Sequence, residues 1–234
     1  MRQHRLRRPL TIVVGFLASV GVSTSVAHYI LPLTNPGFRI FPLIVALHVI
    51  LGSAYLALAP FQFVKRIRSH WPHYHRWAGR LLVTAGLVVG ATALFMAWVI
   101  PFSGWLERIL LGFFGVLFLV ELGKGFLHIR ARQTMLHREW MIRAFALALA
   151  IATMRLIDIP AVIVVSATGV PTHQQLATLA IIADAVAFPL HAVVAEIWIR
   201  TSRRKQAPAA GAAQVRSQEQ ADGASQTSDV LVNL

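Results

Sequence analysis

The 234-residue chain contains no cysteine, so it can form no disulfide, zinc–thiolate or iron–sulfur site. Charged residues are scarce at 13%, whereas a soluble domain carries about a quarter. Hydrophobic residues make up 56%, and the mean hydropathy is +0.63. This composition excludes disorder for most of the chain and argues against a soluble nucleic-acid-binding protein, despite a net charge of +13. A helical membrane protein with several spans remains.

Six apolar stretches follow one another along the chain, at residues 11–33, 41–64, 80–100, 105–127, 140–165 and 175–199. Each has about 20 or more residues, enough to cross a hydrocarbon core of about 30 Å as a helix. We therefore predict an all-α integral membrane protein, a six-helix bundle over residues 11–200. A basic segment (1–10) precedes it, and a disordered tail (206–234), rich in Ala, Gln, Ser and Gly, follows it.

The basic residues predict the orientation of this bundle. Of the 22 Lys and Arg residues, 18 lie in four groups at residues 2–8, 65–80, 124–143 and 200–205, at or near the span ends on one side of the bundle. We predict that the protein lies in the cytoplasmic membrane. The positive-inside rule then places both termini in the cytoplasm. Lipid headgroups, and no nucleic acid, are the expected partners of this charge. Ser25-Val26-Ala27 resembles a signal-peptidase site, but the apolar run continues past it, which favours an uncleaved anchor.

Ionisable residues inside the spans are costly and are therefore candidates for function. By depth they form two groups. We expect an outer group of His28, His48, Arg155 and Asp158, and an inner group of His75, Glu121, His128, His137 and His191. Asp184 in the last span completes an intramembrane polar cluster with His48, Glu121, Arg155 and Asp158.

Several short motifs of the sequence resemble those of a bacterial family of predicted membrane proteins, domain of unknown function 2306. They are His48-Val-Ile-Leu-Gly52, Pro60-Phe-Gln62-Phe, His75-Arg76-Trp77-Ala-Gly79-Arg80, His137-Arg138-Glu-Trp140-Met141-Ile142-Arg143 and Thr153-Met-Arg155. The resemblance covers about residues 40–160. It implies a membrane protein with several spans and implies no activity, so the chemistry has to come from the residues.

One interpretation of the histidines is haem b held between helices, with a role in transmembrane electron transfer and a redox partner. Neutral imidazoles from two facing helices are suitable axial ligands. His28 and His48 would hold an outer haem, and His75 or His137 with His191 an inner one. Arginines at the boundary would pair with the propionates, the candidates being Arg76, Arg80, Arg138 and Arg143.

Two other functions stay open. The acidic and histidine residues at several depths also suit a proton-coupled transporter of small molecules, which at this size we expect to work as a homodimer. A regulatory or assembly subunit without chemistry is the third alternative, with His48 and the Arg155–Asp158 pair serving in packing. The loop histidines His70, His73 and His75 lack the carboxylate or thiolate of a typical metal site. The chain has no nucleophile or phosphate-loop motif, which disfavours a hydrolase.

Overall fold

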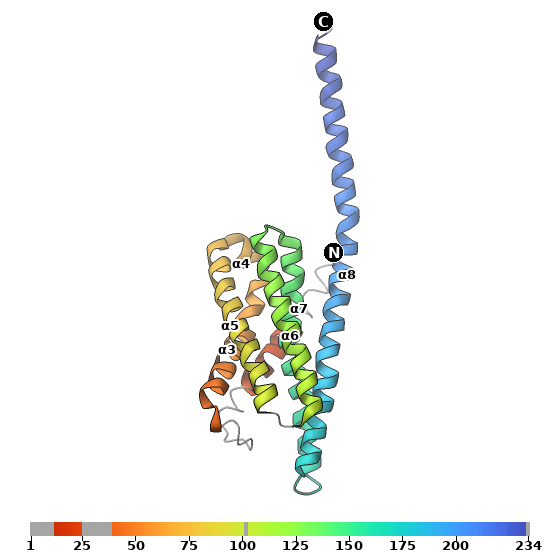
Figure 1. Cartoon of the computed structure of the whole chain (residues 1–234). Helices are drawn as coiled ribbons and strands as arrows, with labels where there is room; N and C mark the ends of the chain where they lie inside the picture. Colours follow the sequence, from red (N-terminus) through yellow and green to blue (C-terminus); the bar gives the residue numbers. More distant parts are fainter. Residues whose placement is uncertain (1–11, 25–38, 101–102, 233–234) are drawn as a thin grey trace. The chain divides into compact units, whose positions relative to one another are not determined.

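The structure, a computed structural model, describes residues 12–24, 39–100 and 103–232, with side chains up to residue 204. Every regular element in these ranges is a helix (Figure 1). After a short apolar helix, Ile12–Thr24, come α3 (Pro42–Gln62), α4 (Lys65–His70), α5 (Pro72–Val99), α6 (Trp105–Arg130), α7 (Thr134–Ser166) and α8 (His173–Val232). The predicted all-α class is therefore confirmed for the described residues.

Five of these helices are long and apolar enough to cross a membrane: α3, α5, α6, α7 and the His173–Arg204 part of α8. Their mean hydropathy over the best window is 1.9 to 2.1. The first predicted span, 11–33, is described only over Ile12–Thr24, and its remainder lies outside the described residues. The chain is thus a membrane protein with several apolar helices.

The helix boundaries follow from local chemistry. Pro42 and Pro72 stand in the first turns of α3 and α5, where the missing N–H has no helical partner to lose. Gly104 precedes α6 with a φ of +91°, a conformation that glycine adopts without steric cost. Arg132 has a φ of +59° and forms the tight turn that reverses the chain from α6 into α7.

Two helices begin earlier than the apolar runs predict. The spans expected at 80–100 and 140–165 belong to α5, which begins at Pro72, and α7, which begins at Thr134. The hydropathy pattern detects the part of a helix that lies in lipid, and both helices continue as polar turns beyond it. His75 and His137 therefore lie near the starts of these helices, five and three residues before the predicted spans begin.

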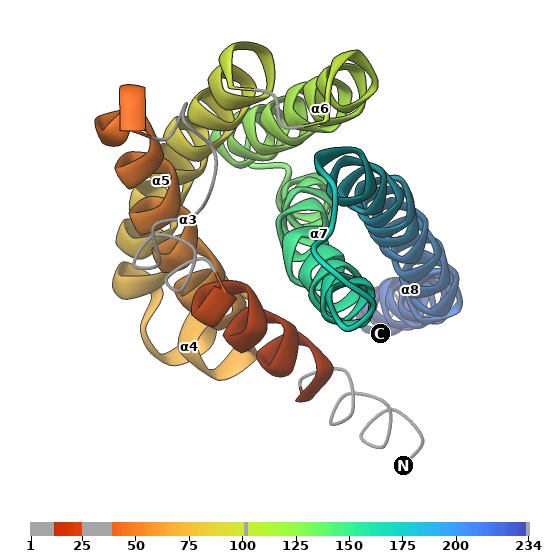
Figure 2. The same ribbon diagram turned by 90° about the horizontal axis from the view of Figure 1, so that it is seen from below.

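Four helices pack in chain order, α3 on α5, α5 on α6 and α6 on α7, and α3 also touches α7 (Figure 2). Tyr55, Phe118, Leu122 and Phe145 are buried in the core between them. Gly86 permits a close approach of α5 and α6, since a Cβ at this position would lie 2.8 Å from a methyl group of Leu122. Small residues at such contacts are typical of membrane helices, whose association depends on close packing.

The outer surface of these helices is apolar. Large side chains such as Ile50, Phe113 and Val164 are at least 60% exposed. In water, such extended apolar surfaces would associate, whereas lipid tails cover them without cost. The exposed side chains therefore agree with a bundle embedded in a bilayer.

The C-terminal part of the chain, Val194–Leu234, is a separate compact unit. The sequence predicts a disordered tail from residue 206, whereas α8 continues as a helix to Val232. Alanine and glutamine, which are frequent there, have high helix propensity. Within this unit, Arg200 pairs with Glu196 at 2.9 Å.

Candidate functional site

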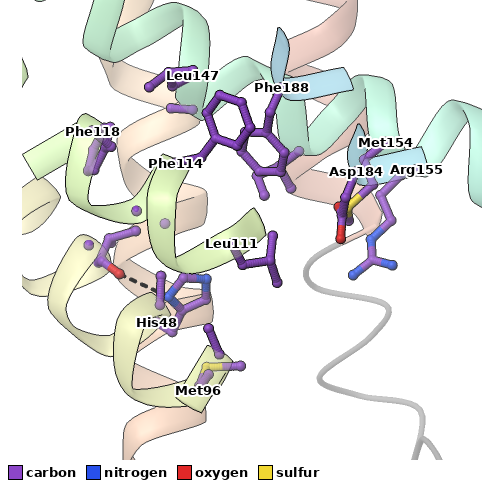
Figure 3. Close-up of a pocket in the computed structure, with 18 of the residues that line it drawn as sticks. His48, Met96, Leu111, Phe114, Phe118, Leu147, Met154, Arg155, Asp184 and Phe188 are labelled. Carbon is purple, nitrogen blue, oxygen red and sulfur yellow. Dashed lines mark hydrogen bonds between the residues drawn. The ribbon is translucent and has the colours of Figure 1, made fainter. Parts of the chain in front are cut away.

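A cavity of about 410 Å³ lies between the helices of the N-terminal unit. Residues of α3, α5, α6, α7 and α8 line it. The cavity begins beside Tyr55 and Phe118 in the middle of the bundle. It extends to Ile100 and Glu107, at the end of the bundle where the chain passes from α5 to α6. Most of its wall is apolar and aromatic, with polar groups at a few positions. Figure 3 shows His48 and Met96 on one side of this space and Arg155 and Asp184 on the other.

His48 is fixed by a hydrogen bond from α3 to α5. Its Nδ1 lies 3.2 Å from the carbonyl oxygen of Val89 and 3.1 Å from the hydroxyl of Thr92. Because a carbonyl oxygen only accepts, the imidazole donates from Nδ1, so in the neutral ring Nε2 is the unprotonated nitrogen. His48 also lines the cavity, so the ring brings an acceptor nitrogen to this part of the bundle.

Three carboxyl groups and one guanidinium line the cavity in the described part of the chain: Glu107, Asp158, Asp184 and Arg155. Arg155 pairs with Asp158, three residues further along α7, at an N–O distance of 3.3 Å. Glu107 accepts a hydrogen bond from the backbone N–H of Ser103. If all four groups are ionised, the net charge of the cavity wall is negative.

Asp184 differs from the other carboxyl groups of the cavity. It is only 3% exposed, and among the described residues its Oδ1 has no hydrogen-bond partner. Glu107, Arg155 and Asp158 all lie within electrostatic reach of it, so Arg155 is shared between two aspartates. A buried carboxylate without full compensation is unfavourable, which makes Asp184 the group in the cavity most in need of a proton or a cation.

The predicted outer group is brought together in part. His48, Arg155 and Asp158 line one cavity, whereas His28 lies outside the described residues. Asp184 joins them there. Sequence reasoning missed Glu107, because it follows a polar turn and gives no signal of burial. The one pattern that could have indicated it is an isolated acidic residue in the first turn of an apolar span.

The predicted inner residues do not line this cavity, and each has its own environment. His137 donates from Nδ1 to the carbonyl oxygen of Gly125 at 2.8 Å, and His191 Nε2 lies 2.8 Å from the hydroxyl of Thr153. Among the described residues, His75 Nδ1 and Glu121 Oε2 are buried without a hydrogen-bond partner. His75 lies within electrostatic reach of His137, so these two histidines are neighbours at the start of α5 and α7.

Of the arginines expected to pair with propionates, Arg143 has its guanidinium 4.7 Å from the ring centre of Trp140. The side chain of Arg80 is exposed. Both are candidates for the inner haem, and neither lines the cavity at His48.

Of the two predicted ligands of the outer haem, His48 lines the cavity and His28 lies outside the described residues. His48 is the one histidine among the described residues that line the cavity, and no group of three or more His, Cys, Asp or Glu in the described ranges could hold a metal ion. A haem carries two propionates, which need cationic partners. Here the single guanidinium is already paired with Asp158, and two further carboxyl groups would face the propionates.

A family model described as a predicted membrane protein, DUF2306, matches residues 45–199. The match includes every described residue of the cavity wall. It ends within α8 at residue 199, beyond the limit of about residue 160 expected from the short motifs. A search of curated proteins and of solved structures gave no match. With two thirds of its length covered by the family model, the chain belongs to the DUF2306 family of predicted membrane proteins.

Proposed function

We propose that the protein is a membrane carrier for small, largely apolar organic cations, which it exchanges for protons at Asp184. The observation that carries this proposal is the buried Asp184 carboxyl group, with an unpartnered Oδ1, in the wall of an apolar cavity. A cavity of this volume is of the size that encloses small organic ligands.

The charges of the wall favour a cation. The Arg155–Asp158 pair is neutral in itself, so an ionised Asp184 adds negative charge to the cavity wall. The aromatic rings add to this preference, because the faces of such rings attract cations. Phe114 and Phe188 stack with centroids 5.1 Å apart, and both line the cavity with Phe118 and Tyr55.

The exchange at Asp184 follows from desolvation. In an empty cavity the carboxyl group holds a proton, since a buried and incompletely compensated charge is costly. When a cation enters, Asp184 becomes a carboxylate paired with that cation, and one proton leaves to the water in the cavity. Each bound cation thus displaces one proton.

Ethidium, an aromatic cation with useful fluorescence, tests the binding step. We expect the purified full-length protein in detergent to bind it, and Asp184→Asn to weaken binding by about tenfold or more, as for loss of a buried charge partner. Calorimetry in buffers of different ionisation enthalpy gives the proton count. It should be about one per ethidium for the natural protein and near zero for Asp184→Asn.

Glu196→Gln provides the matched control, because Glu196 pairs with Arg200 outside the cavity. It should bind ethidium like the natural protein. Equal affinity of Asp184→Asn and the natural protein would contradict the proposal. For the transport step, vesicles that contain the protein should release ethidium in response to an imposed pH gradient, and vesicles with Asp184→Asn should not.

Haem b with electron transfer is the second candidate, and the Nε2 of His48 at the cavity is the observation in its favour. A reduced-minus-oxidised absorbance spectrum of protein from haem-replete cells separates the two. The carrier proposal expects no haem bands. If haem bands are present and His48→Ala removes them, the carrier proposal is wrong and the electron-transfer function takes its place.

For the arrangement in the membrane, we propose six spans, with residues 11–33 as the first and both termini in the cytoplasm. The support is the distribution of basic residues described above, together with the position of α4. Lys65, Arg66 and Arg68 of α4 lie at the same end of the bundle as the α6–α7 turn (Figure 1). The cavity then extends toward the opposite, outer surface of the cytoplasmic membrane.

A further inference from the structure

The α6–α7 hairpin carries a basic surface that the cavity does not use. Between Glu121 and Arg143 the chain has five Lys or Arg residues and two acidic ones, Glu121 and Glu139. Both acidic side chains are buried, with 5% and 7% exposure. The charge that this hairpin presents at its surface is therefore positive.

Trp140 organises part of this surface. The Nζ of Lys124 lies 4.6 Å from the centre of the Trp140 ring, and the guanidinium carbon of Arg143 lies 4.7 Å from it. The ring of His128 is nearly parallel to the indole, at 8° and 6.5 Å between centroids. Cation–π contacts of this kind restrict long basic side chains, so an ammonium from α6 and a guanidinium from α7 are held beside one ring.

The depth of this group matches the headgroup region of a bilayer. Lys124 lies six residues before the end of α6 at Arg130, and Trp140 lies six residues after the start of α7 at Thr134. At 1.5 Å per residue both are about 9 Å from the turn. The exposed Arg130 and Arg132 stand at the turn itself, farther toward the water.

We propose that Lys124, Trp140 and Arg143 bind the phosphate group of an anionic phospholipid at the membrane surface. Charge complementarity is the first argument, since ammonium and guanidinium groups both bind phosphate. The second is the indole, whose ring suits the interface between lipid tails and headgroups. Arg130 and Arg132 add attraction for a headgroup that bears a net negative charge. This inference is independent of the cation carrier.

Thermal unfolding of the full-length protein in detergent tests it, with added phosphatidylglycerol or phosphatidylcholine. We expect phosphatidylglycerol to raise the midpoint temperature more than phosphatidylcholine does. Lys124→Gln and Trp140→Leu should each reduce that difference by about half or more, since one contacts phosphate and the other holds the cations in place. Lys124 is exposed, so Lys124→Gln should fold even if Trp140→Leu does not.

Arg66→Gln is the matched control, because Arg66 is an exposed basic residue of α4 at the same end of the bundle. It should keep the full response to phosphatidylglycerol. Equal losses in Arg66→Gln and Lys124→Gln would overturn the proposal in favour of diffuse surface charge. An equal stabilisation by inorganic phosphate would overturn it in favour of a soluble anion, and an equal effect of phosphatidylcholine would exclude a preference for anionic lipid.

Discussion

The imidazole of His48 on α3 donates a hydrogen bond to the carbonyl oxygen of Val89 on α5, at 3.2 Å and across 41 residues of sequence. The hydroxyl of Thr92, one turn further along α5, lies 3.1 Å from the same nitrogen. His48 thus links α3 to α5 through a hydrogen bond from Nδ1. In the neutral ring, Nε2 is then a hydrogen-bond acceptor.

His48→Leu tests the strength of this fastening. We expect a loss of about 1 kcal/mol in unfolding free energy, typical of an interhelical hydrogen bond in a membrane protein. Thr92→Val should cost less, since Val89 still accepts from His48. In the double variant the two losses should not add, because both residues share one interaction. Thermal or detergent-induced unfolding gives the values, and fully additive losses would speak against a shared contact.

The Arg155–Asp158 pair should respond unequally to removal of its two members. Asp158→Asn leaves Arg155 within electrostatic reach of Asp184, so the guanidinium keeps a partner. Arg155→Gln leaves the carboxyl groups of the cavity without a cation. We expect Arg155→Gln to destabilise by about 1 to 3 kcal/mol and Asp158→Asn by less, on the scale of incompletely paired buried charges. A larger loss for Asp158→Asn in the unfolding measurement would show that Arg155 has no second partner.

Gly86 and Gly123 form a matched pair for helix packing. A methyl group at Gly86 would lie 2.8 Å from Leu122 and 3.1 Å from Tyr55, whereas nothing lies within 4 Å of one at Gly123. Gly86→Ala should therefore destabilise by about 1 to 3 kcal/mol through overpacking. Gly123→Ala should be neutral or stabilising, by up to about 1 kcal/mol. Comparable midpoint temperatures for the two variants would contradict the close approach of α5 and α6.

Because the chain has no cysteine, single cysteines report the orientation without background. Ser69 on α4 and Thr168 between α7 and α8 are both exposed and lie at opposite ends of the bundle. With the cytoplasmic termini that we propose, a membrane-impermeant maleimide should label Thr168→Cys in intact spheroplasts. It should label Ser69→Cys after permeabilisation only. The reverse pattern would invert the topology.

The sequence predicts the membrane fold well, because length and hydropathy are properties of each helix alone. The sequence also predicts that His48 lies near Arg155 and Asp158, since the depth of each residue follows from the direction in which its span runs. The contribution of Glu107 could not be predicted, because its burial depends on how the turn before α6 folds back to Glu107 through Ser103. The starts of α5 and α7 could not be predicted from hydropathy, because polar helical turns outside the lipid have no apolar pattern.

The inner histidines show a second limit of sequence reasoning. His75, His137 and His191 have similar predicted depths, and His75 lies within electrostatic reach of His137, whereas His191 bonds to Thr153. Depth is one coordinate, and the rotation of each helix about its axis decides which side chains meet. That rotation is set by packing, as at Gly125, where a Cβ would collide with the side chain of Met141.

Pro160 lies inside α7, two residues beyond Asp158. Proline has no N–H, so the carbonyl oxygen of Leu156 lacks its usual helical donor. The main chain of α7 consequently has one helical hydrogen bond fewer at the level at which Arg155 and Asp158 line the cavity. Beyond this point α7 supplies Val162 to the cavity wall, so the proline separates the turn that carries the ion pair from an apolar turn that lines the same cavity.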